Sequence, residues 1–157
     1  MAEITKLEIQ KKDKNRVNLY VDDVFYCGLD LDTTVKFGLK KGEISDERLK
    51  EIVFEAQKTD GFNKAVKYLG TSLKTKKQLK DYLTKKEFSI DICDYVIEKM
   101  IEYRYLDDEH YVESYYKTYK NKYGNTKMKF NLISKGVSKK IVEDFFDNLE
   151  DENQDIL

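Results

Sequence analysis

The residues best suited to acid–base or metal chemistry lie together at one point of the sequence. The single histidine, His110, follows Asp107 and Asp108 where a helix is expected to begin. An imidazole beside two carboxylates could act as a general base or as a metal ligand. However, the sequence has no second histidine and no paired cysteines to complete such a site, and carboxylates are favourable at any helix N-terminus. We therefore expect the two aspartates to cap the helix and His110 to be a surface residue.

Other patterns that carry chemistry are absent from the sequence. Cys27 and Cys93 are far apart and have apolar surroundings, which predicts buried thiols rather than a disulfide or a zinc site. No glycine-rich phosphate loop of the GxGxxG or P-loop kind occurs. We expect no catalytic residues, no metal and no cofactor, and therefore a protein that is not an enzyme.

Charged residues are distributed unevenly, although the formal net charge is only −1. Residues 61–140 carry 18 Lys and Arg against 10 Asp and Glu, whereas residues 141–157 carry 7 acids and no base. A basic body that ends in an acidic tail indicates a polyanionic partner, or a protein partner with acidic patches. On charge alone, a solvated helix surface explains the pattern equally well.

Residues 3–30 alternate between apolar and polar side chains, as strands do. The alternation is clearest at Val17, Leu19 and Val21, and Asp22-Asp23 can close a tight turn before the next strand. These residues predict a small antiparallel sheet, after which the apolar spacing becomes helical. We expect helices over residues 32–37, 46–58 (with Ser45 as N-cap), 62–69, 75–86, 90–103, 108–122, 126–135 and 139–149.

The last six of these helices form two copies of a three-helix unit. When the sequence is shifted by 49 residues, apolar positions of the second and third helices coincide. A fixed period of this size indicates tandem helical modules, each too small to close its own core alone. The coincident pairs are Leu79 and Met128, Leu83 and Leu132, Phe88 and Val137, Ile92 and Ile141, Val96 and Phe145, and Met100 and Leu149.

The fold class predicted from these patterns is mainly α, with a small N-terminal antiparallel β-sheet followed by two tandem three-helix repeats. Thr75 and Gln78 fit a capping box, and Ser89 and Ser138 are expected N-caps at equivalent positions. We divide the chain into an N-terminal β-hairpin and helix region at 1–58, a first repeat at 59–105, a second repeat at 106–150 and an acidic tail at 151–157.

Short motifs along the chain resemble those of the RecX family. That family's repeat opens with R-x-R-S-x-x-E-L, where this chain has Ser72–Leu79, and continues with a K-G-F turn, an L-D-D junction and a second K-G-[IV] turn. The corresponding residues here are Lys86-Glu87-Phe88, Leu106-Asp107-Asp108 and Lys135-Gly136-Val137. The N-terminal stretch ITKLEIQKKDKNRVNLYVDD also resembles the opening of RecX proteins from Gram-positive bacteria, so the resemblance spans nearly the whole chain.

The chain departs from the family pattern at several positions. Ser72 and Lys74 replace the two arginines of the opening, and Thr75 and Gln78 replace its serine and glutamate. Glu87 takes the place of the first glycine. These changes preserve the helix cap, but they weaken the case for any contact that needs a bidentate arginine. Longer family members carry a third repeat, and we expect two repeats here.

The resemblance implies a regulator that binds along the groove of the RecA filament on single-stranded DNA. Such a regulator lowers ATP hydrolysis, strand exchange and LexA-type co-protease activity, and so acts in DNA repair, recombination and the SOS response. A helical-repeat nucleic-acid-binding protein that acts without RecA is the alternative, and direct DNA contact is compatible with both. No run of about 18 apolar residues and no signal peptide is visible, so we expect a cytoplasmic monomer without membrane contact.

Lysines recur at the repeat offset, since Lys80 is matched by Lys129 and Lys86 by Lys135. Two modules that present lysines in equivalent places could follow a repeating polyanion or a filament. The alternative is a solvated helix face. The lysines that we expect to bind the filament or DNA are Lys74, Lys76, Lys77, Lys80, Lys86, Lys127, Lys129, Lys135, Lys139 and Lys140.

The second repeat has an excess of apolar residues. Phe130 and Ile133 take the places of Asp81 and Thr84 in the first repeat, away from the predicted core stripe. We expect both side chains to be at least partly exposed and to form part of a contact surface. The N-terminal sheet, the C-terminal segment ending in Ile156-Leu157, another subunit or the filament could cover them.

Tyrosines are concentrated between residues 115 and 123. Tyr115, Tyr119 and Tyr123 are spaced i, i+4 and i+8, with Tyr116 beside them. Aromatic side chains of this kind can stack with bases. Because the same spacing is more typical of a helix face in the core, we expect packing rather than stacking.

Overall fold

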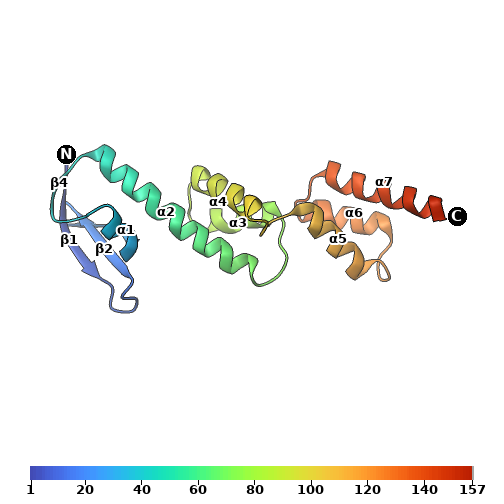
Figure 1. Cartoon of the computed structure of the whole chain (residues 1–157), viewed down its shortest axis with the longest axis horizontal. Helices are drawn as coiled ribbons and strands as arrows, with labels where there is room; N and C mark the ends of the chain where they lie inside the picture. The colour runs from blue at the N-terminus through green and yellow to red at the C-terminus, as the bar shows by residue number, and fades with distance from the viewer. Residues whose placement is uncertain (157) are drawn as a thin grey trace. The chain divides into compact units, whose positions relative to one another are not determined.

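A computed structural model describes residues 1–156, with side chains as far as Asp151. The chain divides into two compact units, Met1–Asp60 and the part from Gly61 onward. The elements, labelled in Figure 1, are β1 (Ala2–Ile9), β2 (Arg16–Val21), β3 (Val24–Asp30), α1 (Leu31–Lys36), β4 (Gly42–Ile44), α2 (Asp46–Leu69), α3 (Lys76–Lys85), α4 (Ile90–Glu102), α5 (Asp108–Tyr119), α6 (Asn125–Ser134) and α7 (Lys139–Ile156).

The first unit is built on a four-stranded antiparallel sheet with the strand order β3-β2-β1-β4. Asp22 and Asp23 have φ angles of 52° and 67°, and Val21 pairs with Val24 across them. Positive φ at both central residues is the geometry of a two-residue turn that matches strand twist. The predicted sheet and its tight turn are therefore confirmed. The short strand β4 was not predicted, because three residues are too few to show alternation.

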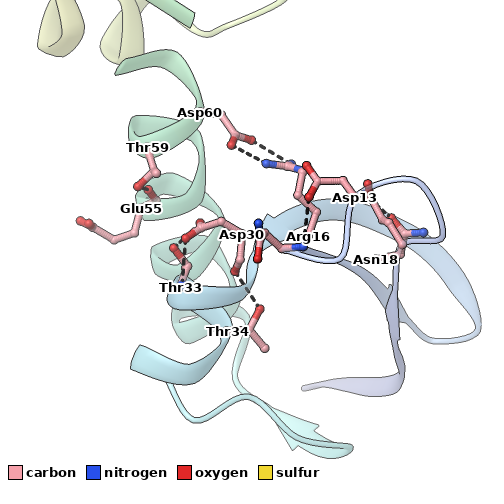
Figure 2. A network of polar contacts seen from close by, with 11 residues as sticks. Asp13, Arg16, Asn18, Asp30, Thr33, Thr34, Glu55, Thr59 and Asp60 are labelled. Carbon is pink, nitrogen blue, oxygen red and sulfur yellow. Dashed lines mark hydrogen bonds and ion pairs between the residues drawn. The ribbon is translucent and has the colours of Figure 1, made fainter. Parts of the chain in front are cut away.

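An ion pair between Arg16 and Asp60 joins the sheet to α2 within this unit (Figure 2). The Arg16 guanidinium donates two hydrogen bonds to the Asp60 carboxylate, with N···O distances of 2.8 and 3.2 Å. Both side chains are partly buried, and the hydrogen bond that Arg16 donates to Asp60 raises the pKa of Arg16. A bidentate pair of this kind fixes direction as well as distance. It therefore orients β2 against the last turns of α2 that belong to the first unit.

Helix α2 runs without a break through the region where two helices were predicted. The prediction of separate helices at 46–58 and 62–69 was wrong. Gly61 suggested a break, but a glycine inside a helix costs only about 1 kcal/mol relative to alanine. Here the helix backbone at Gly61 approaches α4 closely, because an added Cβ would lie 3.1 Å from Val96 and 3.3 Å from Ile92. Packing against α4 offsets the glycine, and no proline is present to end the helix.

The second unit contains two three-helix repeats, each with its own core (Figure 1). In the first repeat, the C-terminal half of α2 packs with α3 and α4 around Ala65, Leu79, Leu83 and Met100, among others. In the second, α5, α6 and α7 enclose a separate cluster, formed by Val112, Tyr115, Met128, Leu132, Val137, Val142 and Phe146. Residues 75–149, all of them described, contain no strand. The predicted fold class is confirmed.

The predicted helix caps are also confirmed. Thr75 and Gln78 form the full capping box, in which the Gln78 N–H donates to the threonine hydroxyl and the glutamine side chain accepts from the Thr75 N–H. Ser89 and Ser138 accept hydrogen bonds from the backbone N–H groups of Ile92 and Ile141, each at 3.3 Å. Local polar residues therefore fix where the second and third helices begin.

The third helices of the two repeats do not bury the same stripe. In α4 the residues Ile92, Val96 and Met100 are fully buried, as predicted. In α7 the fully buried residues are Val142 and Phe146, and the expected Ile141, Phe145 and Leu149 are only half-buried. One position along a helix corresponds to a rotation of about 100°. The offset of 49 residues therefore matches α4 with α7 along the sequence, but α7 is rotated about its axis relative to α4, so the matched residues are not equally buried.

Leu83 provides a direct test of the first core, since its side chain is 0% exposed. Leu83→Ala should lower the free energy of unfolding by about 2–5 kcal/mol, because it removes buried methyl groups and leaves a cavity. Lys85→Ala, an exposed change in the same helix, should alter it by no more than about 0.5 kcal/mol. Denaturant unfolding followed by circular dichroism measures both. Equal losses for the two variants would show that Leu83 is not a core residue.

Candidate partner-binding surface

Four of the ten predicted lysines lie over aromatic rings. The shortest contact places the Lys127 Nζ 4.3 Å from the ring centre of Tyr123. Cation–ring contacts at exposed sites contribute about 0.5–1 kcal/mol each, so these lysines stabilise the repeats as well as charging their surface. The remaining pairs, with distances of 5.0, 5.8 and 5.4 Å, are Lys74 with Tyr68, Lys86 with Tyr82, and Lys129 with Phe146.

Three other predicted lysines have an acidic neighbour one helical turn away. Their N···O distances are 3.8 to 3.9 Å, and all of the side chains are largely exposed. Surface pairs of this kind add little stability, but each carboxylate weakens the positive potential that an anionic partner would meet. The pairs are Lys77 with Asp81, Lys139 with Glu143, and Lys140 with Asp144.

The last three predicted lysines, Lys76, Lys80 and Lys135, are exposed and make no ion pair within the described part of the chain. Lys76 and Lys80 line one depression with Asp94 and Glu98, between α3 and α4. Lys135 lines a different depression, which contains no carboxylate. The structure therefore does not gather the ten lysines into one patch, and it distinguishes Lys135 by its surroundings.

The first turn of α3 is held by the second repeat. Thr75, the N-cap of α3, is 0% exposed, and its hydroxyl donates a hydrogen bond to the carbonyl of Lys135 at 2.7 Å. The Lys76 N–H donates to Asp108 Oδ1 at 2.9 Å. Burial raises the pKa of Asp108, while the N–H and the charge of Lys76 act in the opposite direction. One backbone N–H that is normally left unpaired at a helix N-terminus, that of Lys76, thus finds a partner in the neighbouring module.

Gly136 lies at the same contact between the first turn of α3 and the second repeat. Its φ is +101°, and an added Cβ would overlap the stem of Lys77. The equivalent residue of the first repeat, Glu87, has φ +69° in the same left-handed region. Each residue follows the C-cap lysine of its helix, in the position where a left-handed residue closes the last turn. Glu87 accepts this conformation with strain, whereas at Gly136 both the backbone and the contact with Lys77 require glycine.

The candidate acid–base residues are helix caps in the structure. The Asp107 side chain accepts a hydrogen bond from the His110 N–H at 3.2 Å, which confirms it as the cap of α5. Asp108 caps α3 instead, a role that was not predicted. One carboxylate is enough to cap a helix. The presence of a second aspartate beside Asp107 was therefore the sequence signal for this additional role of Asp108. His110 is exposed, and the described residues include no group of three His, Cys, Asp or Glu side chains that could hold a metal ion.

The two thiols have different surroundings. Cys93 is buried, as predicted, but Cys27 is only half-buried. Burial raises the pKa of Cys27 to about 11, with Asp60 adding to the rise and Arg16 opposing it. A thiol with a raised pKa is a poor nucleophile at neutral pH.

The predicted exposure of Phe130 and Ile133 is confirmed, with exposed fractions of 71% and 45%. Their role in a contact stays a prediction. The side chains of Ile156 and Leu157, which were considered as a cover, lie outside the described residues. No helix in the described part of the chain is long and apolar enough to cross a membrane.

Comparison with known proteins gives a consistent result along the chain. Residues 2–46 match the model of the regulatory protein RecX N-terminal domain, and residues 62–100 match the first three-helix domain of RecX. The chain is 39% identical to regulatory protein RecX of Clostridium perfringens over 155 residues, which cover 98% of this chain and 73% of the relative. It is 33% identical to regulatory protein RecX of Bacillus subtilis over 157 residues, or 98% of this chain and 60% of the relative.

Solved structures show the same fold. A crystal structure of regulatory protein RecX superposes with a TM-score of 0.65 over 95% of this chain and 74% of that chain, at 23% identity. The crystal structure of RecX from Lactobacillus salivarius superposes with a TM-score of 0.54 at 33% identity, over 56% of this chain and 58% of that chain.

The contact between Gly136 and Lys77 can be tested by placing the same substitution at two glycines. Gly136→Ser should lower the free energy of unfolding by about 1–3 kcal/mol, because the new side chain is strained at positive φ and displaces Lys77. Gly124→Ser should be neutral or slightly stabilising, since Gly124 is an N-cap with φ −73° and open space around it. Denaturant unfolding measures both, and equal effects would contradict the steric role of Gly136.

Proposed function

This chain belongs to the RecX family of regulatory proteins, and on that premise we propose that it binds the RecA filament on single-stranded DNA and catalyses no reaction itself. The match to RecX relatives over 98% of the chain carries the proposal. Binding would lower the filament's ATP hydrolysis, strand exchange and LexA-type co-protease activity, in the cytoplasm and as part of DNA repair and the SOS response. The active species would be a monomer.

The structure supports this proposal through the spacing of its modules. The hydrogen bonds of Thr75 and Lys76 to the second repeat hold two similar helical units together. Each repeat ends its second helix with a lysine at the C-cap, Lys86 in α3 and Lys135 in α6. Cations at a fixed separation suit a partner that repeats along an axis, such as a polymer of identical subunits on DNA.

Regulation of this kind requires no chemistry from the bound protein. A protein that binds one filament state more tightly than another shifts the filament toward that state by mass action. The alternative, a helical-repeat nucleic-acid-binding protein that acts without RecA, is favoured by the lysines alone but does not explain the family match.

One titration distinguishes the two functions. The protein is titrated against naked single-stranded DNA and against the same DNA coated with RecA, at matched salt. The proposed function predicts much tighter binding to the coated DNA. Equal affinity for both would support the alternative and overturn the filament proposal.

Charge removal should separate binding from folding. Lys80→Gln with Lys135→Gln removes two exposed lysines that have no ion pair in the described residues. Lys139→Gln with Lys140→Gln removes the same charge from lysines that are already paired with acids. Both double variants should keep their helical content, because glutamine is nearly as good a helix former. The first should weaken inhibition of RecA ATP hydrolysis and flatten its salt dependence more than the second. If both variants inhibit as strongly as the unmodified protein at every salt concentration, the lysines are only a solvated face.

Exposed apolar residues supply a second prediction for the proposed function. Phe130→Ser should change the free energy of unfolding by about 0.5 kcal/mol or less, because most of the ring is already exposed. It should nevertheless weaken filament binding or self-association. Ile90→Ser is a matched control, since Ile90 is 72% exposed on the first repeat. If both variants bind as the unmodified protein does, Phe130 is not part of a contact.

A further inference from the structure

A surface depression of about 360 Å³ on the second repeat is lined by three tyrosines in series. Tyr115 and Tyr119 have ring centres 4.6 Å apart, and Tyr119 and Tyr123 are stacked at 5.3 Å with an interplanar angle of 19°. We call these three residues the tyrosine ladder. Asn131, Ser134 and Lys135 complete the lining. The ladder combines flat aromatic rings with an amide, a hydroxyl and a cation, all on one open surface.

The three-helix fold does not require tyrosines at the two outer positions of this ladder. At the repeat offset, the residues of the first repeat that correspond to Tyr119 and Tyr123 are Gly70 and Lys74. The first repeat nevertheless closes a complete core. Only Tyr115 is buried, and its hydroxyl is fixed by a hydrogen bond of 2.9 Å from Asn131. Tyr119 and Tyr123 pack against that core but are only half-buried, so both residues remain partly accessible to solvent.

Polar groups around the outer rings are available to a ligand. In the described residues, the hydroxyls of Tyr119, Tyr123 and Ser134 make no hydrogen bond. The ammonium groups of Lys122 and Lys127 lie 5.4 and 4.3 Å from the ring centre of Tyr123. A flat aromatic ligand that stacked on this ring would free the lysine cations to meet a neighbouring anion.

Charge separates this depression from the others on the described surface. Four further depressions each include two or three carboxylates in their lining, which would repel an anionic ligand. The tyrosine ladder has none, and Lys135 stands in its lining. A ligand with both planar rings and negative charge therefore matches this place and not the other four.

We infer that the tyrosine ladder, with Lys127 and Lys135, is a binding site for single-stranded nucleic acid. Because Tyr119 already lies between the other two rings, bases continue the stack beyond the outer ring, Tyr123, and the phosphates between them meet the two lysines. Stacking on tyrosine tolerates any base, so the site discriminates strand from duplex rather than one sequence from another. This contact goes beyond the proposed binding of a protein filament and does not depend on it.

Tyrosine fluorescence provides a direct readout, because the chain has 12 tyrosines and no tryptophan. The full chain is titrated with an oligothymidylate strand in the absence of RecA. Base stacking should quench tyrosine emission, and anisotropy of a labelled strand should give the affinity. Tyr119→Leu with Tyr123→Leu should lower that affinity about ten-fold or more and remove most of the quenching, since each base stack is lost while apolar volume is kept. Tyr105→Leu, a change at an exposed tyrosine outside the depression, should alter neither signal.

Three results would overturn the site. One is an unchanged affinity in the double tyrosine variant when its helical content is intact. Another is the absence of quenching in the unmodified protein at saturation, which needs no variant to fold. The third is equal quenching by free thymidine monophosphate, since that would assign the rings to a mononucleotide rather than to a strand. Because no filament is present, these results leave the proposed regulation of RecA untouched.

Discussion

The second unit depends on one buried helix start. The first turn of α3 has backbone N–H groups that cannot be satisfied within the helix, and one of them, that of Lys76, is paired with the second repeat. Thr75 both caps its own helix and donates to the Lys135 carbonyl, while Asp108 accepts from Lys76. Gly136 leaves room for Lys77 beside them. These contacts determine the separation of the two modules, and hence of every side chain that they present.

Within that constraint, the two repeats have a similar three-helix backbone but present different surfaces. Both close a core around the second and third helices, and both place a lysine at the end of the second helix. The second repeat adds the exposed Phe130 and, at the edge of its core, the half-buried Tyr119 and Tyr123 of the tyrosine ladder. A module that repeats its fold but not its surface is suited to a partner that touches the two modules differently. The filament proposed above would be such a partner.

Patterns local in sequence were predictable, and contacts between distant residues were not. The sheet, the capping box at Thr75 and the N-cap at Ser89 each depend on neighbours within a few residues, so the sequence predicts them. The continuous α2 was missed, because the approach of α4 to Gly61 has no local signature. For the same reason the pair of Arg16 with Asp60 and the cap of α3 by Asp108 were not foreseen. For the candidate binding residues, the sequence showed that lysines recur at the repeat offset. It did not show which of these lysines have acidic or aromatic neighbours in the fold.

Coupling of the two repeats through the first turn of α3 is tested most directly by amide hydrogen exchange at Lys76. Amides in the first turn of a helix normally exchange quickly, because they lack a partner within the helix. The Lys76 amide should instead be protected in the unmodified protein, and Asp108→Ala should release it while the His110 amide, capped by Asp107, keeps its protection. Rapid exchange at Lys76 in the unmodified protein would contradict the coupling, and with it the fixed spacing of the two modules.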